Sequence, residues 1–252
     1  VIIMRNKYMQ NKYVCFEGHQ EGVEYRTMDT YSPARTYTLP QPSTIIGMIH
    51  HLMGWTEYHP MQLSIQAVAG PKFNNLQTVY YFSNKKYMPA YVDEKGIAHR
   101  GYHQYYVVNK DGEKTGITRG VAEKQLISEI DLKVYILPKK EEEVEDIKNV
   151  LENPPEYPSL GRHEDLIDIK KVSVGVLERN EKIIQNKNPQ YVGNDEDLID
   201  YEEVESYPVL KSWKENKKLG IREFDRKKAC VLRNVVSQTG YKDETNNLVF
   251  LV

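Results

Sequence analysis

The chain has few of the residues and motifs that would assign it a chemistry. Its 252 residues include only two cysteines, Cys15 and Cys230, without Cys-x-x-Cys spacing. Neither a disulfide framework nor a thiolate zinc site is indicated, and we expect reduced, buried thiols. The longest apolar stretch, residues 44–55, is about half a membrane span. Because the first residues also lack the apolar segment of a signal peptide, we expect a cytoplasmic protein that does not bind membranes.

Catalytic motifs are also missing. No P-loop, Gly-x-Gly-x-x-Gly, Gly-x-Ser-x-Gly or His-Glu-x-x-His pattern occurs. His50 and His51 are adjacent on a predicted helix and point about 100° apart, so we place them at a helix edge near a partner surface. His99 and His103 lie four residues apart, but no carboxylate or thiol completes a metal site. We expect no metal and no other cofactor, and an acid–base ribonuclease built on His99 or His103 stays open.

Charge is nearly balanced, at −2, but it is unevenly placed. Residues 1–140 hold 17 Lys and Arg against 12 Asp and Glu, whereas residues 141–252 hold 17 against 24. A general polyanion-binding protein would be more basic. Tyrosine is abundant, with 19 copies against five phenylalanines, and its ring both stacks and donates hydrogen bonds at interfaces. The balance fits a protein that binds a short RNA with one face and protein neighbours with another.

Hydrophobic periodicity predicts a compact core of four strands and two helices. The strands are expected at residues 12–17, 63–69, 129–137 and 165–177. The first helix follows Pro40 and Pro42, with Ser43 as its N-cap and Gly54 at its end. The second helix is expected at residues 141–151, with acidic residues in its first turn. Gly18 is expected to end the first strand.

The order of these elements is strand, helix, strand, strand, helix, strand. This order predicts an α+β fold with a ferredoxin-like βαββαβ core, here in a single domain covering residues 1–252. Related sheets bind single-stranded RNA, although the fold alone assigns no function.

Three segments lie outside that core. Residues 72–128 are too long for a loop, and tyrosine-rich stretches at 78–82 and 102–108 with an Asp111-Gly112 turn predict a long β-hairpin. The insertion holds nine Lys and Arg against five acids, so its cations and rings fit either single-stranded RNA or a merely solvated face. Residues 179–206 are acidic and are expected to form a mobile loop. Residues 207–252 are expected to add strands at 229–232 and 248–252.

Three motifs occur in an order that resembles the fifth Cas protein family of the RAMP superfamily. The first runs from Gly18 and Tyr25-Arg26 to Pro42-Ser43-Thr44-Ile45-Ile46-Gly47, with Gln41 between the prolines. The second runs from Arg119-Gly120-Val121 to residues 130–135. The third is the Leu-Gly-Arg turn in residues 157–164. The resemblance covers residues 12–178 and is closest to type I-B systems.

The resemblance implies a non-catalytic subunit of a type I CRISPR Cascade effector complex. Such a subunit binds the repeat-derived 5′ handle of the CRISPR RNA, and its hairpin insertion, or thumb, meets the backbone subunit. It also helps to seat the large PAM-reading subunit, with target DNA nearby, while guide–target pairing reads the sequence. The residues that we expect to contact RNA are Arg26, Arg35, Ser43, Lys85, Lys86, Arg100, His103, Tyr105, Arg119, Lys124 and Arg162.

Other interpretations stay open. One branch of the family cuts repeat RNA without metal by using tyrosine, lysine and histidine, but this chain has no adjacent Lys-His pair. Arg162 fits either a phosphate contact or an ion pair with Glu164 or Asp165. A third class of function is an RNA-binding or protein-bridging subunit of the same fold outside CRISPR.

Overall fold

The structure is a computed structural model that describes residues 11–30, 33–101, 103, 105–193, 196–216 and 218–252. The side chains of residues 83–85 and 227 lie outside that description. The helices are α1 (Pro42–Leu52) and α2 (Glu143–Glu152). The strands are β1 (Lys12–Val23), β2 (Met61–Ala69), β3 (Lys72–Lys86), β4 (Tyr91–Val92), β5 (Ala98–His99), β6 (Tyr105–Val108), β7 (Lys114–Pro138), β8 (Asp168–Val176), β9 (Glu178–Arg179), β10 (Ile184–Asn186), β11 (Gln190–Gly193), β12 (Leu198–Asn216), β13 (Ile221–Ser237), β14 (Tyr241–Lys242) and β15 (Leu248–Val249).

The chain divides into two compact units. The hairpin unit comprises Met28–Arg35 and Asn74–Gln125. The core unit comprises the described parts of Val1–Thr27, Thr36–Phe73 and Leu126–Val252. Within the described residues, neither helix is long and apolar enough to cross a membrane.

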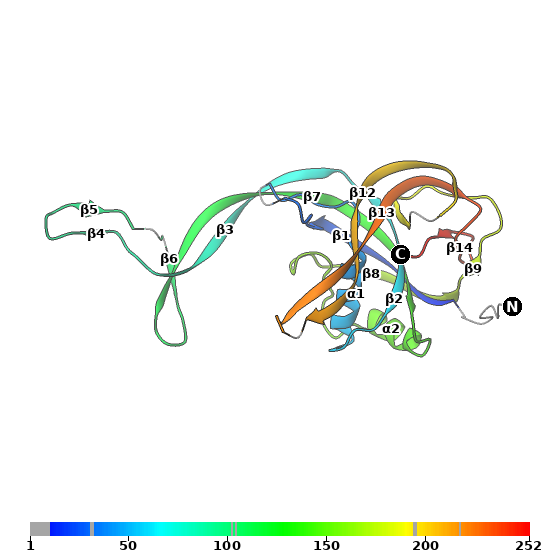
Figure 1. Ribbon diagram of the computed structural model, residues 1–252, viewed down its shortest axis with the longest axis horizontal. Helices are drawn as coiled ribbons and strands as arrows, with labels where there is room; N and C mark the ends of the chain where they lie inside the picture. The colour runs from blue at the N-terminus through cyan, green and yellow to red at the C-terminus, as the bar shows by residue number, and fades with distance from the viewer. Residues whose placement is uncertain (1–10, 31–32, 102, 104, 194–195, 217) are drawn as a thin grey trace. The chain divides into compact units, whose positions relative to one another are not determined.

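The core unit is built on an antiparallel sheet. Strands β8, β1, β7 and β2 lie side by side in that order, each antiparallel to its neighbour. Helix α1 connects β1 to β2, and α2 connects β7 to β8 (Figure 1). All four predicted strands and both predicted helices are present, so the α+β class is confirmed.

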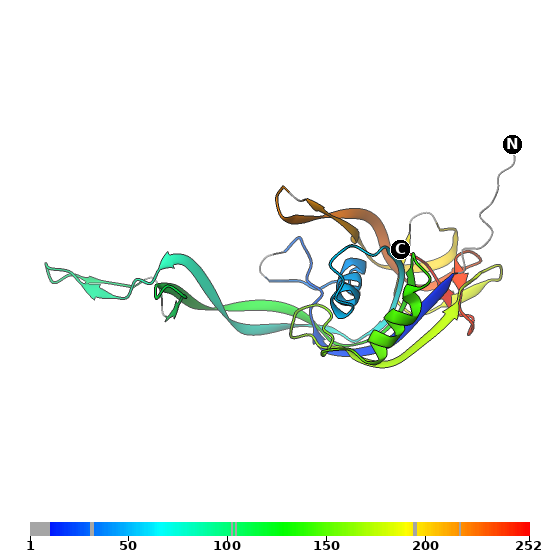
Figure 2. The ribbon, with the colours of Figure 1, turned by 90° about the horizontal axis from the view of Figure 1, so that it is seen from below.

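Most of the apolar core lies between this sheet and the two helices. The alternation of β1 turns Val14 and Phe16 toward Ile45 and Ile49 of α1, and all four side chains are fully buried. Figure 2 shows α1 inside the curve of the strands. Burial of each side chain of this size contributes about 1.5–3 kcal/mol relative to its exposure. The core therefore fixes the register of the strands, and with it the positions of the segments that connect them.

The C-terminal strands cover part of the opposite face of the sheet. Tyr13, Cys15 and Tyr135 point away from the helices and form a second buried cluster with Val249. The hydroxyl of Tyr135 donates a hydrogen bond to Asp243 Oδ2 at 2.8 Å. Bases therefore cannot stack on this part of the face, although related sheets use it for single-stranded RNA.

Helix α1 begins two residues earlier than predicted, and its N-cap is Gln41 rather than Ser43. Pro42 occupies the first helical position, where its missing N–H costs nothing because that group has no partner inside a helix. The Gln41 side chain makes no cap hydrogen bond. Its Oε1 instead accepts from the backbone N–H of Leu210 at 3.0 Å, which ties the start of α1 to β12.

Gly18 does not end β1, contrary to the prediction. The strand continues to Val23, and its register against β8 shifts between Glu17 and Gly18. A Cβ atom at Gly18 would lie 2.9 Å from Cδ1 of Ile167. The glycine therefore allows a close approach of side chain to backbone within the sheet.

Residues 179–206 are not an irregular loop. They include β10, β11 and the first part of β12, and β11 and β13 extend the sheet beyond β2. Tyr191 and Val192 are almost fully buried, whereas Glu202 is exposed and accepts from Arg233 Nε at 2.6 Å. Glu202 and Glu203 are exposed on β12, so the high average charge concealed the buried positions of this segment. The predicted strand at 229–232 lies within β13, whereas only Leu248–Val249 of the strand predicted at 248–252 form a strand, β15.

The hairpin unit contains more strands than a simple hairpin. Both β3 and β6 pair with β7, while β4 and β5 form a separate two-stranded ladder. The predicted strand at 78–82 lies inside β3, and residues 105–108 form β6. Residues 102 and 104 of the predicted second strand lie outside the described part. The Asp111-Gly112 turn is confirmed between β6 and β7, with Gly112 at φ 79°.

The two cysteines and the adjacent pair His50 and His51 differ in their surroundings. Cys15 is buried and Cys230 is half-buried, and both are free thiols. His50 is buried rather than at a partner surface: its Nδ1 donates to the carbonyl of Ile46 at 2.8 Å and its Nε2 accepts from the backbone N–H of His59 at 2.9 Å. Burial lowers the pKa of His50, so the imidazole is neutral. His51 is exposed and lies 2.5 Å from Glu156.

Candidate nucleic-acid interface

The hairpin unit presents many aromatic rings to solvent. Tyr80, Tyr81 and Phe82 on β3 and Tyr105 and Tyr106 on β6 each expose more than a third of their surface. Successive residues of a strand point to opposite sides, so both sides of the ladder carry rings. So many exposed rings on one unit are characteristic of a surface that binds a ligand or a partner protein.

Several of these rings contact one another or a cation. The ring centroids of Tyr80 and Tyr105 lie 6.2 Å apart with an edge-to-face geometry, and those of Tyr87 and Tyr106 lie 4.9 Å apart. Lys114 Nζ lies 4.4 Å above the centroid of the Tyr106 ring. A cation held over an exposed ring places a phosphate-binding charge beside a base-stacking plane. Tyr105, predicted to contact RNA, is exposed, and Tyr106 and Lys114 join it as candidate contacts.

The predicted basic residues of this unit differ in their exposure to solvent. Arg100 and Arg119 are exposed, and Lys124 is half-buried. Lys86 is exposed, but its Nζ lies 2.9 Å from a carboxylate oxygen of Glu113. The side chain of Lys85 lies outside the described part of the chain. The structure therefore offers a dispersed set of cations along the ladder rather than one compact pocket.

Two of the predicted residues are brought together by a short bridge. The backbone N–H of Ala34 donates to Glu123 O at 3.1 Å, and the N–H of Gln125 donates to Ala34 O at 2.8 Å. Arg35 and Lys124 therefore lie on neighbouring, paired segments although they are far apart in sequence. Arg35 is exposed, and its backbone N–H donates to the hydroxyl of Thr30 at 3.1 Å.

His103 lies flat against β7 rather than free in solvent. A Cβ atom on Gly116 would lie 2.2 Å from its imidazole ring, so only glycine fits beneath it. The backbone N–H of Met88 points at His103 Nδ1 from 3.4 Å.

His99 is oriented by a carboxylate and a ring. Its Nε2 lies 2.8 Å from Asp93 Oδ2, and its ring stacks on Tyr91 with centroids 4.7 Å apart. The hydrogen bond from His99 lowers the pKa of the Asp93 carboxyl. An imidazole held in this way is the kind of group that acid–base catalysis uses. No cluster of three metal-binding side chains occurs among the described residues.

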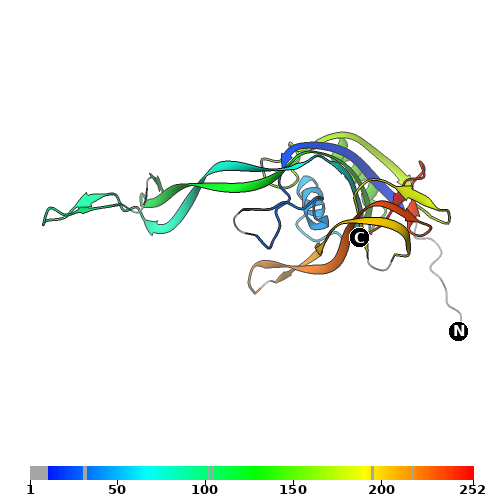
Figure 3. The ribbon, with the colours of Figure 1, turned by 90° about the horizontal axis from the view of Figure 1, so that it is seen from above.

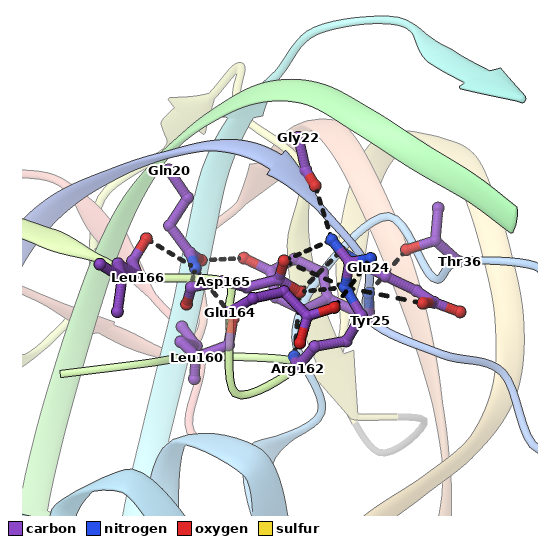
Figure 4. A network of polar contacts seen from close by, with 10 residues as sticks. All are labelled: Gln20, Gly22, Glu24, Tyr25, Thr36, Leu160, Arg162, Glu164, Asp165 and Leu166. Atoms are coloured by element: carbon purple, nitrogen blue, oxygen red, sulfur yellow. Dashed lines mark hydrogen bonds and ion pairs between the residues drawn. The ribbon is translucent and has the colours of Figure 1, made fainter. Parts of the chain in front are cut away.

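In the core unit, the Leu-Gly-Arg turn is tied to the end of β1 by Arg162 (Figure 4). Its Nη2 donates to Asp165 Oδ1 at 2.5 Å and to the carbonyl of Gly22 at 3.0 Å. Carboxylates of Glu24 and Glu164 lie 3.7 and 3.3 Å from the guanidinium. The hydrogen bond to the Asp165 carboxylate raises the pKa of Arg162, so the guanidinium is charged.

Polar residues that the sequence did not single out complete this network. Gln20 Nε2 donates to the carbonyls of Leu160 and Asp165 at 2.8 and 3.1 Å, and its Oε1 accepts from the Tyr25 hydroxyl at 2.6 Å. Gln20 and Asp165 are both buried. Gly161 has φ 114°, and a Cβ there would lie 2.9 Å from Asp165 Oδ2. A glutamine on a predicted strand and an aspartate after a glycine turn give no recognisable motif, which is why they were missed.

This geometry bears on the two interpretations of Arg162. The ion pair with Asp165 and Glu164 is present, and three carboxylates surround the guanidinium. A phosphate brought to this position would meet those negative charges. The contact of Arg162 with RNA stays a prediction, and we leave it out of the interface proposed below. Arg26, by contrast, is exposed beside this network.

Ser43 is half-buried on the first turn of α1. Its hydroxyl has no capping role, because Gln41 holds the cap position. A contact of Ser43 with RNA also stays a prediction.

No family model and no curated protein matches the sequence. Solved structures that match this fold include three CRISPR-associated chains. One is a chain of a CRISPR RNA-guided surveillance complex, 12% identical, covering 92% of each chain with a TM-score of 0.51. The second is a CRISPR protein from Archaeoglobus fulgidus, 9% identical, covering 95% of this chain and 98% of that one, with a TM-score of 0.42.

The third belongs to the type III-B Cmr-beta complex bound to cognate target RNA and AMPPnP, 11% identical, covering 88% of this chain and 85% of that one, with a TM-score of 0.37. At these identities the likeness concerns the fold alone. Only the first of the three is similar enough to support an argument about the fold of this chain.

Proposed function

We propose that this chain is a structural subunit of a CRISPR RNA-guided effector complex that binds the guide RNA without cutting it. The observation that carries the proposal is the likeness in fold, over 92% of both chains, to a chain of a CRISPR RNA-guided surveillance complex. The three sequence motifs support it independently, because they resemble one CRISPR-associated family and occur in the order of that family.

In finer detail, we assign the core to the ferredoxin-like arrangement of the RAMP superfamily. The strand order β8-β1-β7-β2, with one helix after β1 and one after β7, is the order expected of a split βαβ unit. We place the chain in the fifth Cas protein family, closest to type I-B. Its ligand is then the repeat-derived 5′ handle of the CRISPR RNA, in the cytoplasm.

The hairpin unit supplies chemistry suited to such a ligand. Tyr105 and Tyr106 offer stacking planes, and each stacked base contributes about 1–3 kcal/mol. Arg100, Arg119 and Lys114 offer charges for phosphates. By the resemblance, the same unit meets the backbone subunit, and the chain helps to seat the large PAM-reading subunit, with target DNA nearby.

The test is retention and cleavage of labelled repeat RNA by the purified full chain in EDTA. We expect intact RNA and binding that depends on the handle sequence. Replacing Arg26→Ala should weaken retention at about 0.2 M salt, and Arg100→Gln with Arg119→Gln should flatten the log–log salt dependence by about 1.4, or 0.7 per phosphate. The matched control is Lys148→Gln with Lys182→Gln, which removes the same charge elsewhere. Handle-independent binding, or equal loss in the control, would contradict the proposal.

A second candidate function is a metal-independent endoribonuclease, and one observation favours it. His99 is fixed by Asp93 and stacked on Tyr91, as a general base would be. In the same assay, site-specific cleavage in EDTA that is lost in His99→Ala and reduced in Asp93→Asn would establish the nuclease and overturn the non-catalytic assignment. His103→Ala serves as the comparison, since that ring is packed on Gly116.

A further inference from the structure

The hairpin formed by β12 and β13 carries a concentrated positive charge, which the net negative charge of residues 141–252 conceals. Residues 211–228 hold eight Lys and Arg against three Asp and Glu, a net charge of +5 in an otherwise acidic half of the chain. The hairpin belongs entirely to the core unit, and its free end projects from that unit (orange in Figures 1 and 3). It is thus a second basic surface, formed by residues other than those of the hairpin unit.

The charge is ordered along one side of β13. Arg222, Phe224, Arg226 and Lys228 are each two residues apart and all exposed, so they share one side of the strand. We call these four residues the β13 stripe. Between them, Glu223 and Asp225 point to the opposite side, where the Asn216 amide donates to Glu223 Oε1 at 2.7 Å. Glu223 and Asp225 are thereby separated from the stripe cations, and Glu215 is the one acid paired across the ladder with a stripe residue.

The stripe cations are not committed to carboxylates. Elsewhere, exposed and half-buried cations have such partners, for example Arg233 with Glu202 at 2.6 Å and Lys72 with Glu205 at 2.6 Å. Among the described residues, no ion pair involves Arg222, Arg226 or Lys228. Their charge is therefore available to an anionic ligand.

Aromatic rings lie beside the stripe cations near the free end of the β12–β13 hairpin. Phe224 is 40% exposed and pairs across the ladder with Trp213. The guanidinium of Arg222 lies 4.3 Å above the Trp213 ring, and Trp213 rests edge-on against Tyr58 with centroids 5.4 Å apart. Arg222 is thus held in place by the indole, while Phe224 leaves a ring face open to solvent.

We propose that the β13 stripe binds a single strand of nucleic acid, with its cations on successive phosphates and Phe224 stacked on a base. Side chains two residues apart on a strand repeat about every 6.6 Å, which suits the backbone of an extended strand. Charge favours a polyanion, and the exposed ring favours a single strand over a duplex because duplex bases are already stacked. The stripe lies outside the hairpin unit, so the proposal does not depend on the RNA contacts assigned to that unit.

The experiment measures binding of the full chain to fluorescent oligouridine and oligothymidine of about 20 nucleotides, by anisotropy in EDTA from about 50 to 200 mM salt. The stripe variant is Arg222→Gln/Arg226→Gln/Lys228→Gln. The control variant, Lys171→Gln/Lys182→Gln/Lys187→Gln, removes the same charge from exposed positions elsewhere in the core unit. All six side chains are exposed, so equal thermal midpoints will show that the fold is intact.

We expect the stripe variant to bind on the order of tenfold more weakly at 0.1 M salt, with a salt slope shallower by about 2, or 0.7 per phosphate. Phe224→Ala should weaken binding by about 5- to 100-fold without changing the slope, because stacking releases no counterions. Loss with either oligonucleotide supports the proposal, and the one that loses more identifies RNA or DNA as the ligand.

Three outcomes would overturn the proposal. The first is a stripe variant whose affinity and slope equal those of the parent chain. The second is an equal loss in both variants, which would show only a general effect of charge. The third is unchanged oligonucleotide binding together with lost binding of poly-glutamate, which would assign the stripe to an acidic protein. Handle-specific retention of repeat RNA does not enter this measurement, so failure here and failure of the proposed function can be told apart.

Discussion

At the scale of single residues, Asp165 holds the Leu-Gly-Arg turn together. Its carboxylate accepts from Arg162 and from the backbone N–H of Glu24, and it is buried. We predict that Asp165→Ala lowers the free energy of unfolding by about 3–5 kcal/mol, because it leaves a mostly buried guanidinium and a backbone N–H without this acceptor. Urea unfolding measures the change.

Glu164 provides the control for this prediction. It also lies near Arg162, at 3.3 Å, but 63% of its side chain is exposed. Glu164→Ala should therefore cost no more than about 1 kcal/mol. Equal losses from the two substitutions would mean that solvent screens the Asp165 pair as well, and the account of the network would be wrong.

Arg162 also shows what single positions in a sequence cannot reveal. Arg162 was correctly recognised as a charged side chain in a glycine turn, with an ion pair as one of two interpretations. Its surroundings depend on Gly22 and Glu24, about 140 residues away, which only the pairing of β1 with β8 brings near. The exposure of Tyr105 and Arg119 was easier to anticipate, because an alternating polar insertion has no apolar partner to bury it.

At the scale of elements, the turn between β14 and β15 closes one face of the sheet. Asp243 accepts hydrogen bonds from the side chains of Tyr135, Asn247 and Thr245. Burial alone would raise the pKa of Asp243, but the hydrogen bonds from Asn247, Tyr135 and Thr245 outweigh it and hold the pKa well below its usual range. A charged carboxylate therefore holds the β14–β15 turn against Tyr135 of β7.

This predicts a pH-dependent contribution to stability. A carboxyl whose pKa is lowered on folding stabilises the fold above its unfolded pKa of about 3.9 and loses that contribution as the pH falls toward its folded pKa. Asp243→Asn should therefore cost about 1–3 kcal/mol at pH 7, and the difference from the parent chain should shrink below about pH 4. Urea midpoints at pH 7, 4 and 3 measure this, and a deficit that does not change with pH would contradict it.

The elements also separate what the sequence could predict from what it could not. The strands of the core and both helices were predictable because each has a clear apolar period, as in Val14 and Phe16 of β1. The start of α1 was misplaced because Ser43 is the better cap residue in isolation, whereas Gln41 is held by Leu210 of a distant strand. Of the long β12–β13 ladder only residues 229–232 were predicted, because charged residues dominate the rest and the two strands pair only with each other at the free end.

At the scale of the whole molecule, the division into two units implies that the core unit folds without most of the hairpin unit. The core unit contains its own buried clusters, and Ser128 N–H donates to the carbonyl of Pro71 at 3.0 Å just before the units separate. Replacing residues 74–125 with an Asn-Gly turn would therefore close two paired strands with a turn of suitable length.

We predict that this shortened chain unfolds cooperatively, with a thermal midpoint within a few degrees of the parent, because none of the core clusters loses a member. It should lose the binding contributed by Tyr105, Arg100 and Arg119 but keep the salt-dependent binding of the β13 stripe. Circular dichroism and oligouridine anisotropy on the same preparation measure both. A shortened chain that folds but no longer binds would place all nucleic-acid affinity in the hairpin unit, whereas one that fails to fold would show that the two units depend on each other.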